Sequence, residues 1–177
     1  MFELTASFVS SQILMLAAMV LGFASLQFRA RKHIFLTLAI GAGLISAHYF
    51  LLGKVAAGVI VSFSVLRFVT AIFTSDKKYI LIFLALNTIA LFFTYKEIYD
   101  LLVFFGIAII VIGNFQASDK HMRSSLIFGT SLVLLYNTLI FSPMGIVEEG
   151  SFLISNLIGY FRFHIKKQKP PKIITSV

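Results

Sequence analysis

The stretch VAAGVIVSFSVLRFVTAIFT, residues 55–74, decides the fold of this chain. Its twenty residues carry one charge, at Arg67, and a helix needs roughly 20 apolar residues to cross the hydrocarbon core of a bilayer. Water is absent at that depth, so the backbone must satisfy its own N–H and C=O groups, as it does in a helix. Residues 55–74 therefore predict a transmembrane helix.

Further apolar runs of similar length lie on either side of this stretch. The seven predicted spans are 8–28, 34–52, 55–74, 79–95, 98–115, 124–141 and 145–165. The composition agrees, because 59% of the residues are hydrophobic and 12% are charged, whereas a soluble domain has about 25% charged residues. A transmembrane barrel would instead alternate apolar and polar residues over segments of about ten. We therefore expect an all-α membrane protein with seven transmembrane helices.

The basic residues between these runs predict the orientation of the chain. Twelve of the 15 Lys and Arg residues fall in one set of loops, whose acidic residues are Asp76 and Asp119. The opposite set holds Lys54 and Lys96 together with five acidic residues. Since short basic loops stay in the cytoplasm, we expect the N-terminus outside and the C-terminus, with the tail 166–177, inside. The net charge of +8 is then a topology signal, and we expect no nucleic-acid partner.

The chain resembles itself at an offset of 88 residues. Residues 47–58 align with residues 135–145 when one residue is dropped before the glycine. We therefore expect two three-helix repeats, 8–74 and 98–165, joined by a connector helix at 79–95 that restores the orientation for the second repeat. Parallel repeats related by an axis along the membrane normal occur in transporters such as the SWEET proteins, so the prediction is a SWEET-like 3+1+3 arrangement.

Two segments resemble a known family. HYFLLGKVAAG (48–58) with VLRF (65–68), and MGIVEEGSFLISNLIGYFRF (144–163), are similar to YgjV-type bacterial inner-membrane proteins. The resemblance implies a small bacterial inner-membrane protein, similar in layout to SWEET, SemiSWEET and PnuC-type carriers. The chain departs from the family pattern at Tyr136, where a histidine is expected, while His48 is kept.

Three polar residues inside the predicted spans are candidate substrate-binding residues. Arg67 lies roughly two turns from the cytoplasmic end of its span, where a charge costs about 2.5–3.5 kcal/mol on insertion scales. It either contacts an anionic or polar substrate, latches the cytoplasmic gate, or extends to the lipid headgroups. Asn156 and Asn87 lie in the middle of spans and should face protein, because an unpaired amide in lipid is costly. We expect Arg67 and Asn156 to line one central, water-accessible cavity.

A second group of candidates lies near the outer ends of two spans. His48 and Tyr49 are offset by 88 residues from Tyr136 and Asn137. The four side chains form either an outer vestibule or an aromatic belt at the membrane interface, where Tyr is common.

The last span begins with two neighbouring acids, Glu148 and Glu149. Adjacent residues on a helix point roughly 100° apart, so we expect at most one of them to face inward. One acid favours the positive end of the helix dipole, and Glu149 is expected inside because it opens the motif shared with the family. No Asp or Glu lies in the middle of a predicted span, so coupling through a buried acid pair is not expected and facilitated diffusion is favoured over proton symport.

These features predict a transporter or facilitator of a small polar solute, a sugar or a vitamin-like nucleoside, that works by alternating access between the two bundles. The alternative is a non-transporting inner-membrane scaffold or assembly protein with a packed interior. No HExxH, GxSxG or phosphate-binding glycine loop occurs, and the chain has no Cys, so we expect no enzyme activity, no cofactor and no metal site. The expected partners are the lipid bilayer and the solute, with the chain a monomer or a homo-oligomer.

Overall fold

The structure is a computed structural model that describes residues 6–25, 28, 31–74, 76–116 and 119–161. Within these residues the chain forms seven helices and no strand: α1 (Ala6–Ser25), α2 (Arg31–Leu51), α3 (Val55–Phe73), α4 (Lys78–Thr94), α5 (Asp100–Asn114), α6 (Asp119–Leu139) and α7 (Pro143–Tyr160). Each predicted span coincides with one helix, so the all-helical class is confirmed. The tail 166–177 and the last residues of the seventh predicted span lie outside the described residues.

The largest difference from the predicted bounds lies at the start of α6. This helix begins at Asp119 rather than at residue 124, because its first turn is charged and hydropathy alone leaves that turn outside the span. A helix continues to bond its backbone beyond the hydrocarbon core, where water and headgroups solvate charged side chains. For the same reason α2 begins at Arg31 rather than at residue 34.

The turns before α3 and α7 have the same backbone geometry. Gly53 has φ 72° and Phe141 has φ 54°, and these are the positive-φ positions among the described residues. Four backbone hydrogen bonds of the first turn recur in the second turn 88 residues later. The last of the four is donated by Gly58 N in one turn and by Ile146 N in the other. The turns therefore match without the one-residue gap expected before the glycine.

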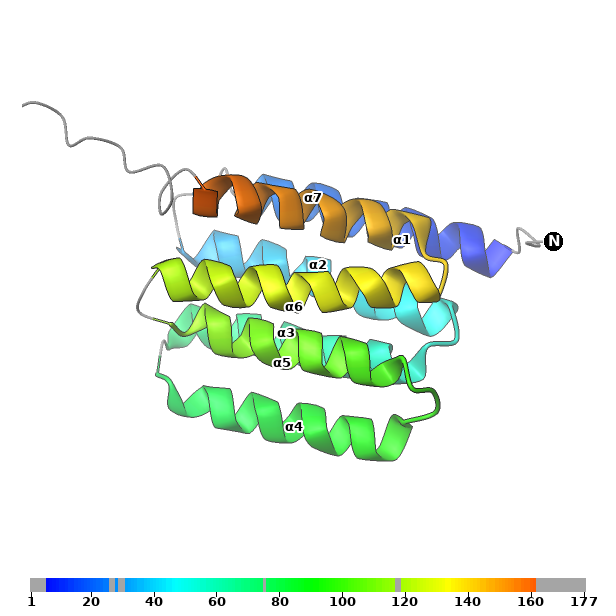
Figure 1. The fold of residues 1–177 in the computed structure, drawn as a ribbon, viewed down its shortest axis with the longest axis horizontal. Coiled ribbons are helices and arrows are strands. Elements are labelled where there is room, and N and C mark those ends of the chain that lie inside the picture. The colour runs from blue at the N-terminus through cyan, green and yellow to red at the C-terminus, as the bar shows by residue number, and fades with distance from the viewer. Residues whose placement is uncertain (1–5, 26–27, 29–30, 75, 117–118, 162–177) are drawn as a thin grey trace, which may run out of the picture.

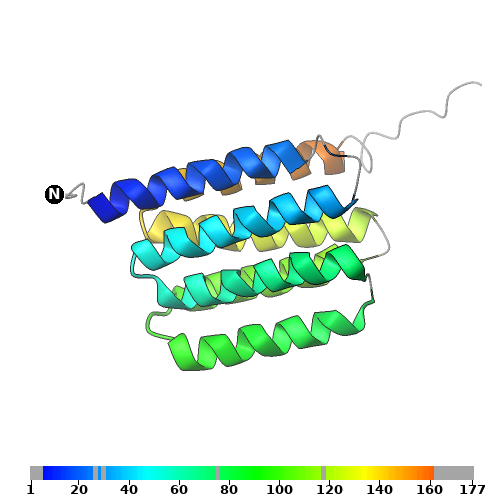
Figure 2. The same cartoon turned by 180° about the vertical axis from the view of Figure 1, so that it is seen from behind.

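The helices form two facing rows of three. Figure 1 shows α1, α2 and α3 in one row and α7, α6 and α5 in the other, and Figure 2 shows the same rows from behind. Across the rows α1 packs against α7 and α3 against α5, while α4 packs against both α3 and α5 and covers that edge. The middle helices, α2 and α6, approach each other less closely than these edge pairs.

The outer faces of the bundle are apolar. Phe73, Phe92 and Phe93 are 82%, 81% and 79% exposed, whereas soluble monomers rarely expose contiguous apolar patches larger than a few hundred Å². By length and composition, α1 and α3 are each long and apolar enough to cross a membrane, and Phe35–Leu51, Lys78–Thr94 and Asp100–Asn114 are shorter apolar helices. The described residues are therefore consistent with a helical membrane protein in which two spans are clear.

Two glycines set the contact between α5 and α6. A Cβ atom built on Gly129 would lie 2.7 Å from the carbonyl oxygen of Gly106, and one built on Gly106 would lie 2.9 Å from that of Gly129. Backbone atoms cannot move aside as the tip of a flexible side chain can. Small residues of this kind allow helices to pack closely inside a membrane.

Candidate functional site

A cavity of about 180 Å³ lies between the two rows of helices. Six helices contribute to its wall, α1, α2, α3, α5, α6 and α7, which places it inside the bundle. Most of the wall is apolar, and its polar side chains are Tyr49, Ser64, Arg67, Thr130, Glu148 and Glu149. Acidic and basic side chains therefore line one small space.

Arg67 lies on α3 and faces the interior of the bundle. The residue is 6% exposed and lines the cavity, so its side chain does not extend to the lipid headgroups. Within the described residues, Nε and Nη1 have no hydrogen-bond partner, and the guanidinium carbon lies 4.9 Å from the ring centre of Phe68. An unpaired buried charge is costly, so these N–H groups are available to whatever fills the cavity.

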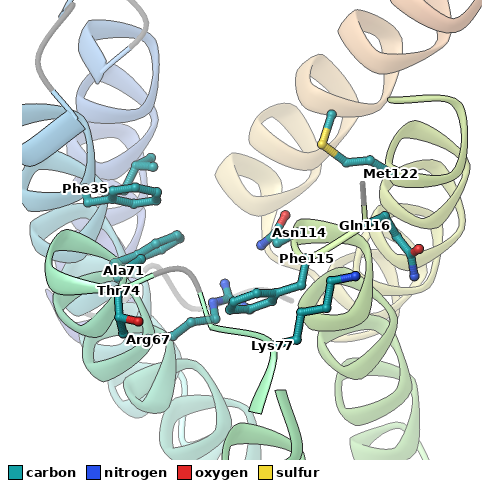
Figure 3. A pocket seen from close by; sticks show the side chains of 11 residues that line it. Phe35, Arg67, Ala71, Thr74, Lys77, Asn114, Phe115, Gln116 and Met122 are labelled. Atoms are coloured by element: carbon teal, nitrogen blue, oxygen red, sulfur yellow. The ribbon is translucent and has the colours of Figure 1, made fainter. Parts of the chain in front are cut away.

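A second, wider cavity of about 400 Å³ adjoins the first at Leu38, Arg67 and Phe68, which line both. Figure 3 shows Arg67, Lys77 and Asn114 around this space. Lys77, at the start of α4, and Asn114 and Gln116, at the end of α5, are exposed. The wider cavity therefore reaches the surface at the end of the bundle where the basic loops lie, and Arg67 stands between it and the deeper cavity.

Both glutamates at the start of α7 line the central cavity. The expectation that at most one of Glu148 and Glu149 faces inward is therefore wrong. α7 stands at the corner of its row and packs against both α1 and α6, so an arc of about 100° can face the interior. Facilitated diffusion was favoured because no Asp or Glu lies in the middle of a predicted span. Both glutamates lie near the start of α7, so this preference stays a prediction.

Thr130 is a polar group that no sequence pattern singled out. It is fully buried on α6, lines the cavity, and its hydroxyl has no hydrogen-bond partner among the described residues. A threonine inside a helix usually bonds its own backbone, as Ser131 does with Ile127 O at 2.8 Å. The sequence therefore carries no signal that separates Thr130 from its neighbour.

The opposite end of the cavity is closed by a packed cluster. Tyr49 donates a hydrogen bond to Asn137 Oδ1 at 3.2 Å, and its ring centre lies 5.7 Å from that of Tyr136 in an edge contact. All three residues are at most 1% exposed. The sequence correctly grouped these residues with His48, but the group is neither an open vestibule nor a belt exposed at the membrane interface.

His48 joins three helices beside this cluster. Its Nδ1 lies 2.8 Å from the carbonyl oxygen of Ser11 on α1, which can only accept, so Nδ1 donates. In the neutral ring Nε2 then accepts from the Ser142 hydroxyl at 3.0 Å, and that oxygen accepts from Gly145 N at 3.3 Å. His48 therefore holds the start of α7 against α1 and α2.

The two predicted asparagines lie apart from both cavities. Asn156 is buried on α7, but its amide nitrogen donates to Phe152 O at 3.0 Å, and neither cavity includes it. Asn87 is buried on α4, where its Oδ1 has no partner among the described residues. The structure thus does not bring Asn156 and Arg67 to one of these cavities.

Comparison with known proteins identifies a family. Residues 9–167 match the model of Imp-YgjV, described as a bacterial inner membrane protein. No curated protein and no solved structure matches the chain. In the described residues, no three His, Cys, Asp or Glu side chains gather as metal ligands.

Proposed function

Since the chain belongs to the Imp-YgjV family of bacterial inner membrane proteins, we propose that it transports a small polar solute across the inner membrane. The observation that carries this proposal is the central cavity, whose wall holds Arg67, Thr130 and Glu148, each with a buried polar atom that lacks a partner among the described residues. Leaving such atoms unpaired is costly. A solute that enters the cavity would supply their hydrogen bonds.

The size of the cavity favours a small solute. Its volume of about 180 Å³ is below the range of about 300–1,000 Å³ that is usual for pockets that bind drug-sized ligands. The expected classes, a sugar or a vitamin-like nucleoside, are therefore tested from their smallest members upward.

The proposed mechanism is alternating access between the two rows of helices. We propose that the rows are parallel repeats, and the matched turns at Gly53 and Phe141 support this. With the N-terminus outside, the wider cavity opens toward the cytoplasm and the Tyr49–Asn137 cluster closes the outer side. The arrangement is then an inward-open state, and the opposite state requires this cluster to separate.

We further propose that all seven helices span the membrane and that one chain suffices for the pathway, because both rows that enclose the cavity come from it. The protein then works as a monomer or as a homo-oligomer of complete units, with lipid and solute as its partners. The proposal includes no catalytic step and no nucleic-acid partner.

The experiment is a thermal-shift screen of the purified protein with sugars, nucleosides and vitamins, followed by uptake of each stabilising compound into proteoliposomes. A ligand at 100 times its Kd stabilises the folded state by about 2.7 kcal/mol, so a true solute raises the melting temperature. Protein-free liposomes are the control. The scaffold alternative expects no compound to shift the melting temperature and no uptake above the control.

A further inference from the structure

We propose that the solute of the central cavity is a small zwitterion, bound with its anionic group at Arg67 and its cationic group at Glu148 and Glu149. The inference rests on the proposed transport function, because it names the solute class for the same cavity. The basic side chain of Arg67 and the acidic side chains of both glutamates lie in the wall of one cavity of about 180 Å³.

The charges in this wall are not paired with each other. Within the described residues, no ion pair of 4.0 Å or less joins Arg67 to either glutamate. Arg67 Nε and Nη1 and Glu148 Oε2 are buried without hydrogen-bond partners. The cavity therefore offers a donor group and an acceptor group to the same ligand.

The two signs are separated along the bundle. Arg67 lies 12 residues after Val55, the first residue of α3, or about 18 Å at 1.5 Å per residue. Glu149 lies six residues after Pro143, the first residue of α7, or about 9 Å. Both helices start at the same end of the bundle (Figure 1). The glutamates are thus nearer the closed end, and Arg67 is nearer the wider cavity.

Other solute classes leave one part of the wall unsatisfied. A neutral solute offers no charge to Arg67 or to the glutamates. A simple anion pairs with Arg67 but is repelled by the two glutamates. A simple cation pairs with the glutamates but is repelled by Arg67. A zwitterion matches both groups, and like-charge juxtaposition disfavours its singly charged analogues. The unpartnered hydroxyl of Thr130 gives the solute a further polar contact in the same wall.

The test uses ω-amino acids of increasing length on the purified full chain. The series is glycine, 3-aminopropanoate, 4-aminobutanoate and 6-aminohexanoate, each compared with its N-acetyl derivative, which keeps only the anion, and its amide, which keeps only the cation. D-Glucose and uridine are the neutral probes. Calorimetry should show that one length binds best, and that both singly charged derivatives of that length bind at least about tenfold more weakly.

Charge-neutral variants assign the two ends of the solute. Arg67→Gln and Glu148→Gln should each weaken zwitterion binding at least about tenfold. In Arg67→Gln the amide derivative should bind as well as the zwitterion, because the partner of the carboxylate is gone. The ratio of the two affinities, zwitterion to amide, is measured on protein that is monodisperse and melts cooperatively. A change in this ratio then reports binding and not a loss of folding. Lys96→Gln, at an exposed site outside both cavities, is the matched control and should bind as the wild type.

The outcomes distinguish this inference from the transport proposal. If D-glucose or uridine binds and is taken up while no zwitterion is, the solute class is wrong and transport stands. The zwitterion is equally excluded if the N-acetyl anion binds as tightly as the zwitterion and Glu148→Gln has no effect. If no compound binds or enters proteoliposomes, both proposals fail.

Discussion

Tyr49 donates a hydrogen bond to Asn137 Oδ1 over 3.2 Å, and the two residues lie 88 positions apart, the offset at which the chain resembles itself. The bond joins α2 to α6, the middle helices of the two rows. Equivalent positions of two related units meet only near the axis that relates them. Tyr49 and Asn137 therefore mark the place where the proposed repeats touch at the closed end.

Replacing Tyr49 by Phe should loosen this closed end. A neutral hydrogen bond contributes about 0.5–1.5 kcal/mol, so its loss should raise the population open on this side about two- to tenfold. The measurement is the rate at which an impermeant thiol reagent, added outside, labels a single cysteine at Val133, a residue that lines the central cavity. Tyr95→Phe, at an exposed position, is the control. Equal labelling rates in Tyr49→Phe and wild type would show that the bond does not hold the gate.

His48 should contribute to stability more than its exposed counterpart His33. Truncation to Ala leaves the Ser142 hydroxyl and the Ser11 carbonyl without their partner, which costs about 1–3 kcal/mol. The free energy of unfolding, measured by denaturant titration in detergent, should fall by this amount in His48→Ala. His33→Ala should change it by less than about 0.5 kcal/mol. A smaller loss for His48 than for His33 would contradict the hydrogen-bond assignment.

The contact of α5 with α6 should not tolerate a methyl group at Gly129. In Gly129→Ala the new Cβ overlaps the backbone of Gly106, and overpacking of this kind costs about 1–3 kcal/mol. Gly150→Ala is the matched control, because nothing lies within 4 Å of its new Cβ and Ala favours the helix by about 1 kcal/mol. The melting temperature should fall for the first variant and hold or rise for the second. A drop of the same size in both would remove the special role of Gly129.

The proposed orientation places the exposed Glu97 side chain outside and the exposed Asp76 side chain in the cytoplasm. The chain has no Cys, so single cysteines at these positions report the side directly. In intact cells an impermeant reagent should label Glu97→Cys, while Asp76→Cys should react only after the membrane is opened. Ser142 is unsuitable as an outer probe, because it is fully buried and bonded to His48. Labelling of Asp76→Cys in intact cells would reverse the orientation.

Hydropathy predicted the helices well because each helix among the described residues contains an apolar run. It placed the start of α6 five residues late, since charged residues such as Lys120 and Arg123 continue the helix beyond the apolar run. The alignment gap before Gly145 was wrong because sequence identity favoured matching two glycines. The backbone hydrogen bonds instead place Ile146 opposite Gly58.

The candidate site was predicted in part, and Glu149, which lines the cavity, was expected inside because it opens the motif shared with the family. Arg67 was found because it is a charge within an apolar run. Glu148 and Thr130 were missed. They line the cavity because of the way α6 and α7 are rotated about their axes relative to the other row, and the sequence of one helix does not determine this rotation. Asn156 was placed in the cavity on similar depth alone, and its amide bonds its own helix instead.

The position of α4 makes the two edges of the bundle unequal. It packs against both α3 and α5 and also connects them along the chain. At the other edge α1 and α7 pack against each other, and no helix of the described residues connects them. In a dimer of two separate three-helix units, the two edges would be equivalent interfaces. We expect the rows to move about α4, with the larger displacement at the α1–α7 edge, where Ser142 and the two glutamates lie at the start of α7.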